Sequence, residues 1–239
     1  MSLETPTPLN HDGTEYEGVL VSRRDRLQRP VVILFPTVAG VSELELGFAR
    51  QLVDLGYTGF VADPFGSALR GAPRETMMET MAELREDRGR LLELLLAIVE
   101  QVRGLGAADP QRIAVIGFCF GGLCALDVAR SGADVAGVAS FHGVLDPPGL
   151  QPRPITAKVV VYHGWDDPLA RPEAVTALAT ELTGAGADWQ LHAFGHVAHG
   201  FTNPRADGSN PGIQYNALAT ERSWTGFINF LEELFGADG

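Results

Sequence analysis

The stretch that decides the fold is Arg112-Ile113-Ala114-Val115-Ile116-Gly117-Phe118-Cys119-Phe120-Gly121-Gly122, which an Ala/Leu-rich stretch follows. It predicts a strand that turns sharply into a helix, with Cys119 at the strained turn. Only small neighbours such as Gly117 and Gly121 let the strand and the helix approach this closely. The sulfur would stand above the sheet edge, which makes Cys119 a candidate nucleophile. Taken alone, the run leaves open a buried structural cysteine, because free cysteine is among the most buried residue types.

Short β-branched segments alternate with amphipathic segments of helical length along the rest of the chain. This alternation predicts an α/β fold with a mostly parallel central sheet and helices on both faces. The segment Glu17 to Ser22, before the first helix, is expected to pair antiparallel at the sheet edge. The expected strands are 30–35, 58–62, 112–117, 135–141, 158–163 and 189–194, and the expected helices are 43–55, 74–102, 123–129, 173–182 and 216–235.

The composition predicts a single domain over 1–239, because 239 residues with 45% hydrophobic content can bury a large core. The polar, proline-interrupted start, Met1 to Asn10, has the pattern of neither a signal peptide nor a membrane span. Two cysteines, Cys119 and Cys124, are too few for a disulfide framework, so reduced thiols and a cytoplasmic location are expected. With 18 basic against 30 acidic residues, the net charge of −12 argues against nucleic acid and anionic membranes as partners.

Two later loops offer partners for the cysteine. Functional groups of an open parallel sheet gather on the loops at the carboxyl ends of its strands. The chain order of nucleophile, acid and histidine is the order of the α/β-hydrolase arrangement, unlike that of chymotrypsin or subtilisin. The loop after the strand 158–163 offers Asp166 and Asp167, and the loop after the strand 189–194 offers His196 and His199.

One member of each pair is preferred. Either aspartate could cap the helix that follows; Asp167 is favoured as the residue that orients the histidine, and a loop cap or a solvated carboxylate is preferred for Asp166. His199 precedes the small Gly200 and lies deeper in its loop, so it is favoured over His196 as the base.

The remaining histidines have plainer interpretations. His142 and His163 end expected strands; a hydrogen-bonded structural role is preferred for each, and lining the pocket is the alternative. No H-E-x-x-H motif or paired-carboxylate spacing accompanies the histidines, so neither a metal site nor a cofactor is predicted.

At this point the residues resemble the dienelactone hydrolase family, whose pattern combines a G-x-C-x-G-G elbow, a G-x-x-D-P-like loop and a late histidine loop. The similarity spans nearly the whole chain. It implies an α/β-hydrolase fold without a large lid, with Cys119 as nucleophile, Asp167 as orienting acid and His199 as base. Further matching runs are Leu55-Gly56-Tyr57, Ala62-Asp63, His199-Gly200-Phe201-Thr202-Asn203-Pro204, Tyr215-Asn216 and Glu221-Arg222-Ser223-Trp224.

The segment Pro36-Thr37-Val38-Ala39-Gly40 departs from the family pattern. Members usually carry a glutamate at the position of Thr37 that contacts the resting cysteine. A neutral hydroxyl cannot act as that base, so Cys119 must be activated by His199, or be held as a thiolate by the imidazolium and the helix N-terminus. Nearby Glu43 and Glu45 are expected to begin the next helix, in a capping or surface role.

Two backbone groups are expected to hold the oxyanion. The N–H of Phe120 lies at a helix N-terminus and points beside the sulfur. The resemblance implies the N–H of Val38 as the second donor, which survives any change of side chain.

A second departure concerns the substrate. Enzymes that act on the anionic dienelactone use arginines to hold its carboxylate, but here one such place is taken by Asn203 and the segment Thr76 to Ala82 has no arginine. A neutral or weakly polar ester, lactone or thioester is therefore expected. The candidate substrate-binding residues are Thr37, Phe65, Trp165, Phe201 and Asn203, with core packing as the alternative for the aromatic ones.

These observations predict a carboxylic ester hydrolase that forms an acyl-enzyme on Cys119 and releases it to water. The partner is a small-molecule ester or lactone, and a homodimer is compatible with the sequence. The alternative is a weakened ligand-binding or thiol redox-responsive protein on the same fold, which the missing glutamate favours. A peptidase or acyltransferase is disfavoured, since no extra domain selects peptides.

Overall fold

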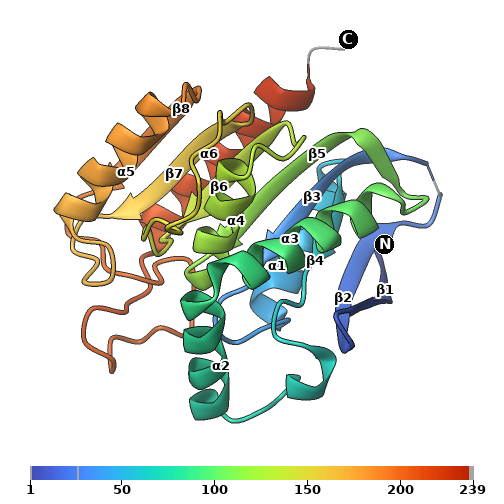
Figure 1. Cartoon of the computed structure of the whole chain (residues 1–239), viewed down its shortest axis with the longest axis horizontal. Coiled ribbons are helices and arrows are strands. Elements are labelled where there is room, and N and C mark those ends of the chain that lie inside the picture. Colours follow the sequence, from blue (N-terminus) through green and yellow to red (C-terminus); the bar gives the residue numbers. More distant parts are fainter. Residues whose placement is uncertain (1, 26, 237–239) are drawn as a thin grey trace.

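The computed structural model describes residues 2–25 and 27–236, and within them eight strands form one sheet covered by helices on both faces (Figure 1). The strand order is β1-β2-β4-β3-β5-β6-β7-β8, and the six strands from β4 to β8 run parallel. This confirms the mostly parallel α/β fold without a large additional domain. The strands are β1 (Ser2–His11), β2 (Thr14–Arg23), β3 (Arg29–Phe35), β4 (Thr58–Val61), β5 (Ala108–Phe118), β6 (Gly137–Phe141), β7 (Lys158–Gly164) and β8 (Trp189–Phe194).

Side chains of the central strands alternate between two apolar layers, as a strand period of two requires. Ile33 belongs to the layer that α3, α4 and α5 cover, and Leu34 to the layer that α1 and α6 cover. In Figure 1 α3, α4 and α5 lie on the near side of the sheet, and α1 and α6 lie behind it. The helices are α1 (Glu43–Asp54), α2 (Arg74–Glu86), α3 (Arg88–Arg103), α4 (Phe120–Arg130), α5 (Pro172–Gly184) and α6 (Ala217–Phe235).

The predicted sheet edge was wrong. β2 pairs antiparallel with β4, as expected for the segment 17–22, but β1 pairs with the other side of β2 from Ser2 to His11. The start of the chain is therefore the edge strand. Its two prolines, Pro6 and Pro8, count against an inner strand but are tolerated at an edge, where one side of the backbone has no partner strand.

The predicted helix over 74–102 was also wrong, because it is two helices. The break falls at Asp87, whose backbone is non-helical at φ −107° and ψ 75°. The carboxylate of Asp87 accepts a hydrogen bond of 3.0 Å from the N–H of Arg90 and so caps α3. Aspartate competes well for this capping geometry, and a periodicity count does not detect it.

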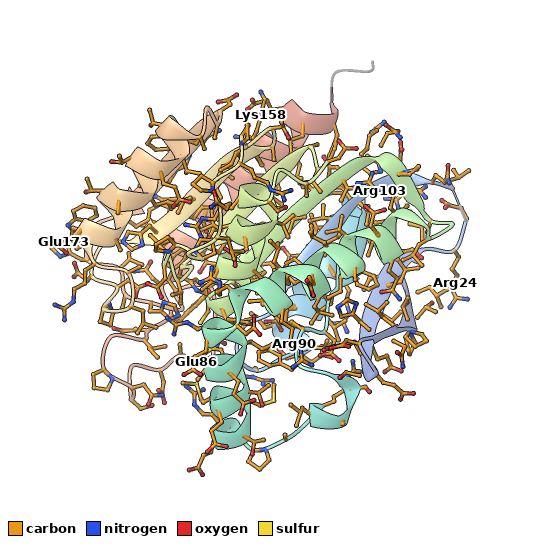
Figure 2. All side chains as sticks on the ribbon, in the orientation of Figure 1. Arg24, Glu86, Arg90, Arg103, Lys158 and Glu173 are labelled. Carbon is orange, nitrogen blue, oxygen red and sulfur yellow. The ribbon has the colours of Figure 1, made fainter. Side chains whose placement is uncertain are left out.

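Charged side chains such as those of Arg24, Lys158 and Glu173 lie at the outline of the molecule (Figure 2). None of the helices in the described part of the chain is long and apolar enough to cross a membrane.

Candidate active site

Cys119 occupies the tight turn between β5 and α4, with φ 56° and ψ −115°. This left-handed conformation is costly for any residue except glycine, so the packing around it must hold it in place. A Cβ added to Gly117 would lie 1.8 Å from the carbonyl oxygen of Gly121, and one added to Gly121 would lie 2.0 Å from that of Phe35. Larger residues at either glycine would therefore push the helix away from the sheet.

Backbone hydrogen bonds fix the turn on both sides. The N–H of Cys119 donates to the carbonyl of Phe141 at 3.1 Å, and the carbonyl of Cys119 accepts from Gly122 at 3.0 Å and from Val144 at 3.3 Å. The end of β6 and the loop after it thus support the elbow. The side chain of Cys119 is partly exposed, whereas Cys124 on α4 is fully buried and both thiols are free.

The two expected oxyanion donors are unused by the rest of the protein. Among the described residues, neither the N–H of Phe120 nor that of Val38 donates to a backbone or side-chain acceptor. Phe120 is the first residue of α4, so its N–H belongs to the positive end of the helix. Free N–H groups in this position are able to bind an anionic oxygen.

Asp167 and His199 lie together at the carboxyl ends of β7 and β8, on the loops expected to carry them. The Nδ1 of His199 donates to Oδ2 of Asp167 at 2.7 Å, and the two residues are only 3% and 2% exposed. The rival residues also meet, but on the surface: Nδ1 of His196 lies 3.8 Å from Oδ2 of Asp166, with the His196 side chain 99% exposed. The two pairs therefore differ in burial: Asp167 and His199 are buried, whereas Asp166 and His196 are exposed.

The pKa of His199 is raised to about 10. Burial by itself disfavours the imidazolium, but the hydrogen bond to Asp167 and the nearby Cys119 outweigh it. Nε2 of His199 is buried and has no hydrogen-bond partner among the described residues. The ring therefore has one nitrogen held by the carboxylate and one left for the cysteine or a bound molecule.

Two further histidines lie near His199, and for both of them lining the pocket was the alternative to a structural role. The ring of His142 meets that of His199 edge-on, with centroids 5.1 Å apart, and its Nε2 shares a 2.8 Å hydrogen bond with Oγ1 of Thr202. His142 is fully buried at φ 38°, a second strained residue beside the elbow. Burial, and secondarily the positive charge of His199, holds the pKa of His142 well below its usual range.

His163 is the third histidine of this group. It is 1% exposed, and neither of its ring nitrogens has a hydrogen-bond partner in the described structure. Burial lowers its pKa, against the attraction of Asp167. The expected hydrogen-bonded strand-end role therefore fits His142, which bonds Thr202, but not His163. Across residues 2–25 and 27–236, no group of three or more His, Cys, Asp or Glu residues is arranged to hold a metal ion.

The candidate substrate-binding residues lie in different environments. Phe65 is buried, with its ring centroid 5.4 Å from that of Phe120, and Cys119 and Val38 pack against the same apolar cluster. Phe201 is fully buried and meets His142 edge-on at 5.1 Å, so it contributes core packing behind the histidines.

The other three candidates are more accessible. Trp165 is 45% exposed, with its ring 6.3 Å from that of His163. The side-chain oxygen of Asn203 accepts from the N–H of Arg205 at 3.0 Å, and Oγ1 of Thr37 accepts from the N–H of Ala39 at 3.2 Å. The side chains of Asn203 and Thr37 therefore each stabilise the conformation of the loop to which they belong.

Glu45 corrects the expectation for the first turn of α1. Glu43 is exposed and pairs with Arg50, as a surface role predicts. Glu45, however, is 0% exposed, and its carboxylate accepts from the N–H of Thr37 at 3.1 Å. Burial raises the pKa of Glu45. Glu45 stands three residues after the N-cap Ser42, as in a capping box, but its side chain also accepts a hydrogen bond from Thr37 in the preceding loop.

The strand order, the strained elbow after β5 and the acid and histidine on later loops define an α/β hydrolase. The chain belongs to the dienelactone hydrolase family, whose model matches residues 16–235. It is accordingly a hydrolase that acts on esters.

Solved structures and curated relatives agree with this placement. The structure titled m3DLH is 33% identical over 98% of both chains, with a TM-score of 0.88. The dienelactone hydrolase-like promiscuous phosphotriesterase P91, from metagenomic libraries, is 30% identical over 98% of both chains, with a TM-score of 0.87. The carboxymethylenebutenolidase of Pseudomonas putida is 23% identical over 218 residues, which are 89% of this chain and 91% of that protein.

Proposed function

We propose that the protein hydrolyses a small neutral or weakly polar ester, lactone or thioester through an acyl-enzyme on Cys119. The observation that carries this proposal is the buried Asp167–His199 hydrogen bond of 2.7 Å, whose histidine keeps a free Nε2 near a cysteine in a strained elbow. A structural ion pair would have no need of that free nitrogen.

The mechanism follows from these positions. The Cys119 thiolate attacks the carbonyl carbon, and the N–H groups of Phe120 and Val38 stabilise the oxyanion. The bond from that carbon to the leaving oxygen, or to the leaving sulfur of a thioester, then breaks as the His199 imidazolium gives the leaving atom its proton. In the second half, His199 takes a proton from water, the water oxygen attacks the thioester, and the acid leaves as the Cys119 thiolate is restored.

Activation without the family glutamate is the step that this chain must achieve differently. Thr37 stands in that position and its hydroxyl is engaged by the N–H of Ala39. His199, with its pKa raised to about 10, carries the positive charge that favours a thiolate opposite it. The positive end of the α4 helix dipole also favours negative charge on the sulfur of Cys119.

Neutral substrates are supported by the surroundings of the sulfur. Cys119 packs against an apolar cluster that includes Phe65, Phe120 and Met77. Of the arginines that flank the segment 76–82, Arg85 is paired with Asp146. Introducing a cation by Asn203→Arg should therefore shift the preference toward anionic esters.

Phosphotriesters are a second candidate substrate class. Identity of 30% over 98% of both chains relates this protein to P91, a promiscuous phosphotriesterase. The same thiolate would attack phosphorus and expel an aryloxide, which the His199 imidazolium would protonate. The phosphorylated cysteine would then be hydrolysed by water, with His199 as the base. A p-nitrophenyl phosphotriester that releases p-nitrophenol over many turnovers would support this activity.

The deciding experiment is acyl-enzyme trapping. The protein is incubated with short p-nitrophenyl esters and lactones, and intact mass spectrometry records adducts. We expect an adduct that turns over in the wild type and in Cys124→Ala, which removes the buried thiol. It should be absent from Cys119→Ala, and full activity in that variant would refute the proposal. A wild type that never acylates but oxidises rapidly with peroxide would support the redox alternative.

The cytoplasmic location and a homodimeric state remain predictions. Cell fractionation and size-exclusion chromatography with light scattering would test them.

A further inference from the structure

Glu45 is a buried carboxyl group for which the proposed reaction has no step. It lies in the first turn of α1, 0% exposed, where an acidic side chain would ordinarily point to water. Burying a carboxyl group is costly unless hydrogen bonds compensate it. Its partners therefore indicate why the residue is retained inside.

Both partners belong to the loop that joins β3 to α1. Oε1 of Glu45 accepts from the N–H of Thr37 at 3.1 Å, and Oε2 contacts Oγ of Ser42, which donates to it, at 2.5 Å. Thr37 lies near the start of that loop and Ser42 is its last residue. One carboxyl group thus connects both ends and sets the separation between them.

The backbone N–H groups inside this connection are partly engaged, and those of Val41 and Ser42 have no acceptor among the described residues. The N–H of Ala39 donates to Oγ1 of Thr37 at 3.2 Å, and the N–H of Gly40 donates to the carbonyl of Thr37 at 3.0 Å. Of the four successive N–H groups from Thr37 to Gly40, only that of Val38 has no acceptor among the described residues. These hydrogen bonds orient the segment 37–40 and leave the N–H of Val38 free.

We propose that Glu45 is a positioning residue that holds the Val38 N–H where the oxyanion forms. This inference rests on the proposed function. Glu45 does not replace the missing family glutamate as a base toward the cysteine, because both of its oxygens are already committed to the loop. Burial raises the pKa of Glu45, against the hydrogen bonds that it accepts.

The test separates oxyanion binding from folding with two variants. Glu45→Met keeps the length of the side chain but leaves the Thr37 N–H without an acceptor. Glu45→Gln retains an amide oxygen for that N–H and an amide N–H for Ser42. Glu43→Gln, in the same helical turn but exposed, is the matched control.

Three readouts are measured on each variant: kcat, KM for a p-nitrophenyl ester, and the inhibition constant of a trifluoromethyl ketone, which forms a tetrahedral oxyanion on the cysteine. Removing an oxyanion donor typically costs about 10²- to 10³-fold, so misplacing one in Glu45→Met should cost roughly 10- to 100-fold in kcat and in ketone affinity. KM should change less than about twofold, because substrate binding precedes the oxyanion. Glu45→Gln should recover most of the loss, and Glu43→Gln should match the wild type.

The outcomes distinguish this inference from the proposed function. Equal losses of substrate and ketone binding in Glu45→Met, or unchanged ketone affinity, would overturn the positioning role alone. If Glu45→Met does not fold, Glu45→Gln and Ser42→Ala decide, since Ser42→Ala removes one of the two loop contacts. Ser42→Ala should then weaken binding of the ketone more than binding of the substrate. Equal losses of ketone and substrate binding would overturn the inference. A wild type that never acylates would overturn the proposed function and the role of Glu45 with it.

Discussion

Two buried ionic clusters in the described part of the chain differ in how completely their atoms are paired. Between α3 and α4, Asp127 accepts from Nε and Nη2 of Arg88 at 2.8 and 2.6 Å, and from Arg130 at 3.3 Å. Arg130 also donates to Glu181 at 2.7 Å. At the carboxyl end of the sheet, Asp167 and His199 form the other cluster.

The first cluster is saturated, in the sense that none of its buried side-chain nitrogen and oxygen atoms lacks a hydrogen-bond partner, whereas the second cluster has such atoms. Of the seven buried side-chain nitrogen and oxygen atoms without a partner in the described residues, four are nitrogens of His142, His163 and His199. None belongs to Arg88, Asp127 or Arg130. Buried polar atoms are normally satisfied, so a local excess of unsatisfied ones calls for an explanation. A structural network gains stability from pairing every atom, whereas a reactive site reserves atoms for its substrate.

The largest expected effect tests the unsaturated cluster. Asp167→Asn keeps the size of the side chain but no longer holds the imidazolium and its tautomer. In a comparable triad this change costs about 10⁴-fold in kcat, so kcat/KM for an ester should fall by roughly 10³- to 10⁴-fold. Circular dichroism should remain that of the wild type. A variant that retains a tenth of the activity would show that the buried pair has no catalytic part.

The next effect tests the saturated cluster. Asp127→Ala leaves the buried guanidinium groups of Arg88 and Arg130 without their shared carboxylate. Removing one partner of a buried pair costs about 3–5 kcal/mol, so urea unfolding should show a loss of that order. The kcat/KM of the folded fraction should stay within about twofold of the wild type, in contrast to Asp167→Asn.

The control for this effect is the pair between half-buried Arg103 and exposed Asp134, whose atoms are 4.0 Å apart. Asp134→Ala should leave the urea midpoint unchanged, because exposed ion pairs contribute little. If Asp127→Ala were equally silent, the saturated cluster would have no structural role either.

The sequence allowed the fold and the preferred pair of site residues to be predicted because both depend on local features. Gly117 and Gly121 flank Cys119 within one turn, and Asp167 and His199 follow strand ends that a parallel sheet brings to one edge. The structure places those two residues 2.7 Å apart. Their catalytic roles stay predictions until the variants are measured.

What the sequence could not predict depends on contacts between distant segments or on backbone geometry. His142 and Thr202 are 60 positions apart, yet they share a hydrogen bond beside His199. The burial of Glu45 depends on how the loop before α1 folds back over it. A lone histidine and a helix-start glutamate have many structural roles, and only three-dimensional packing selects one.

A smaller expected effect concerns how the stability of the protein depends on pH through the buried His142. The pKa of buried His142 lies well below its ordinary value of about 6.5. The unfolded chain therefore binds this proton more readily, and stability falls as pH drops below about 6.5. Removing the group by His142→Phe, which keeps an aromatic ring against His199, should make that decline shallower by roughly 1 kcal/mol per pH unit.

The measurement is the difference between the urea unfolding free energies of the wild type and His142→Phe from pH 7 to pH 5. Taking the difference cancels groups common to both proteins, including Glu45, whose raised pKa acts in the opposite direction. Profiles that stay parallel over this range would show that His142 is not held neutral by the fold.

The smallest expected effect comes from the exposed copy of the reactive pair. Asp166 and His196 have the same residue types as Asp167 and His199 and lie on the same two loops, but their side chains are exposed and 3.8 Å apart. Water competes for both groups, so the contact orients neither of them. The double variant Asp166→Asn/His196→Gln should keep kcat/KM within about twofold and leave the urea midpoint unchanged. A loss approaching that of Asp167→Asn would mean that residue type and loop position, rather than burial and an unpaired nitrogen, select the pair that reacts.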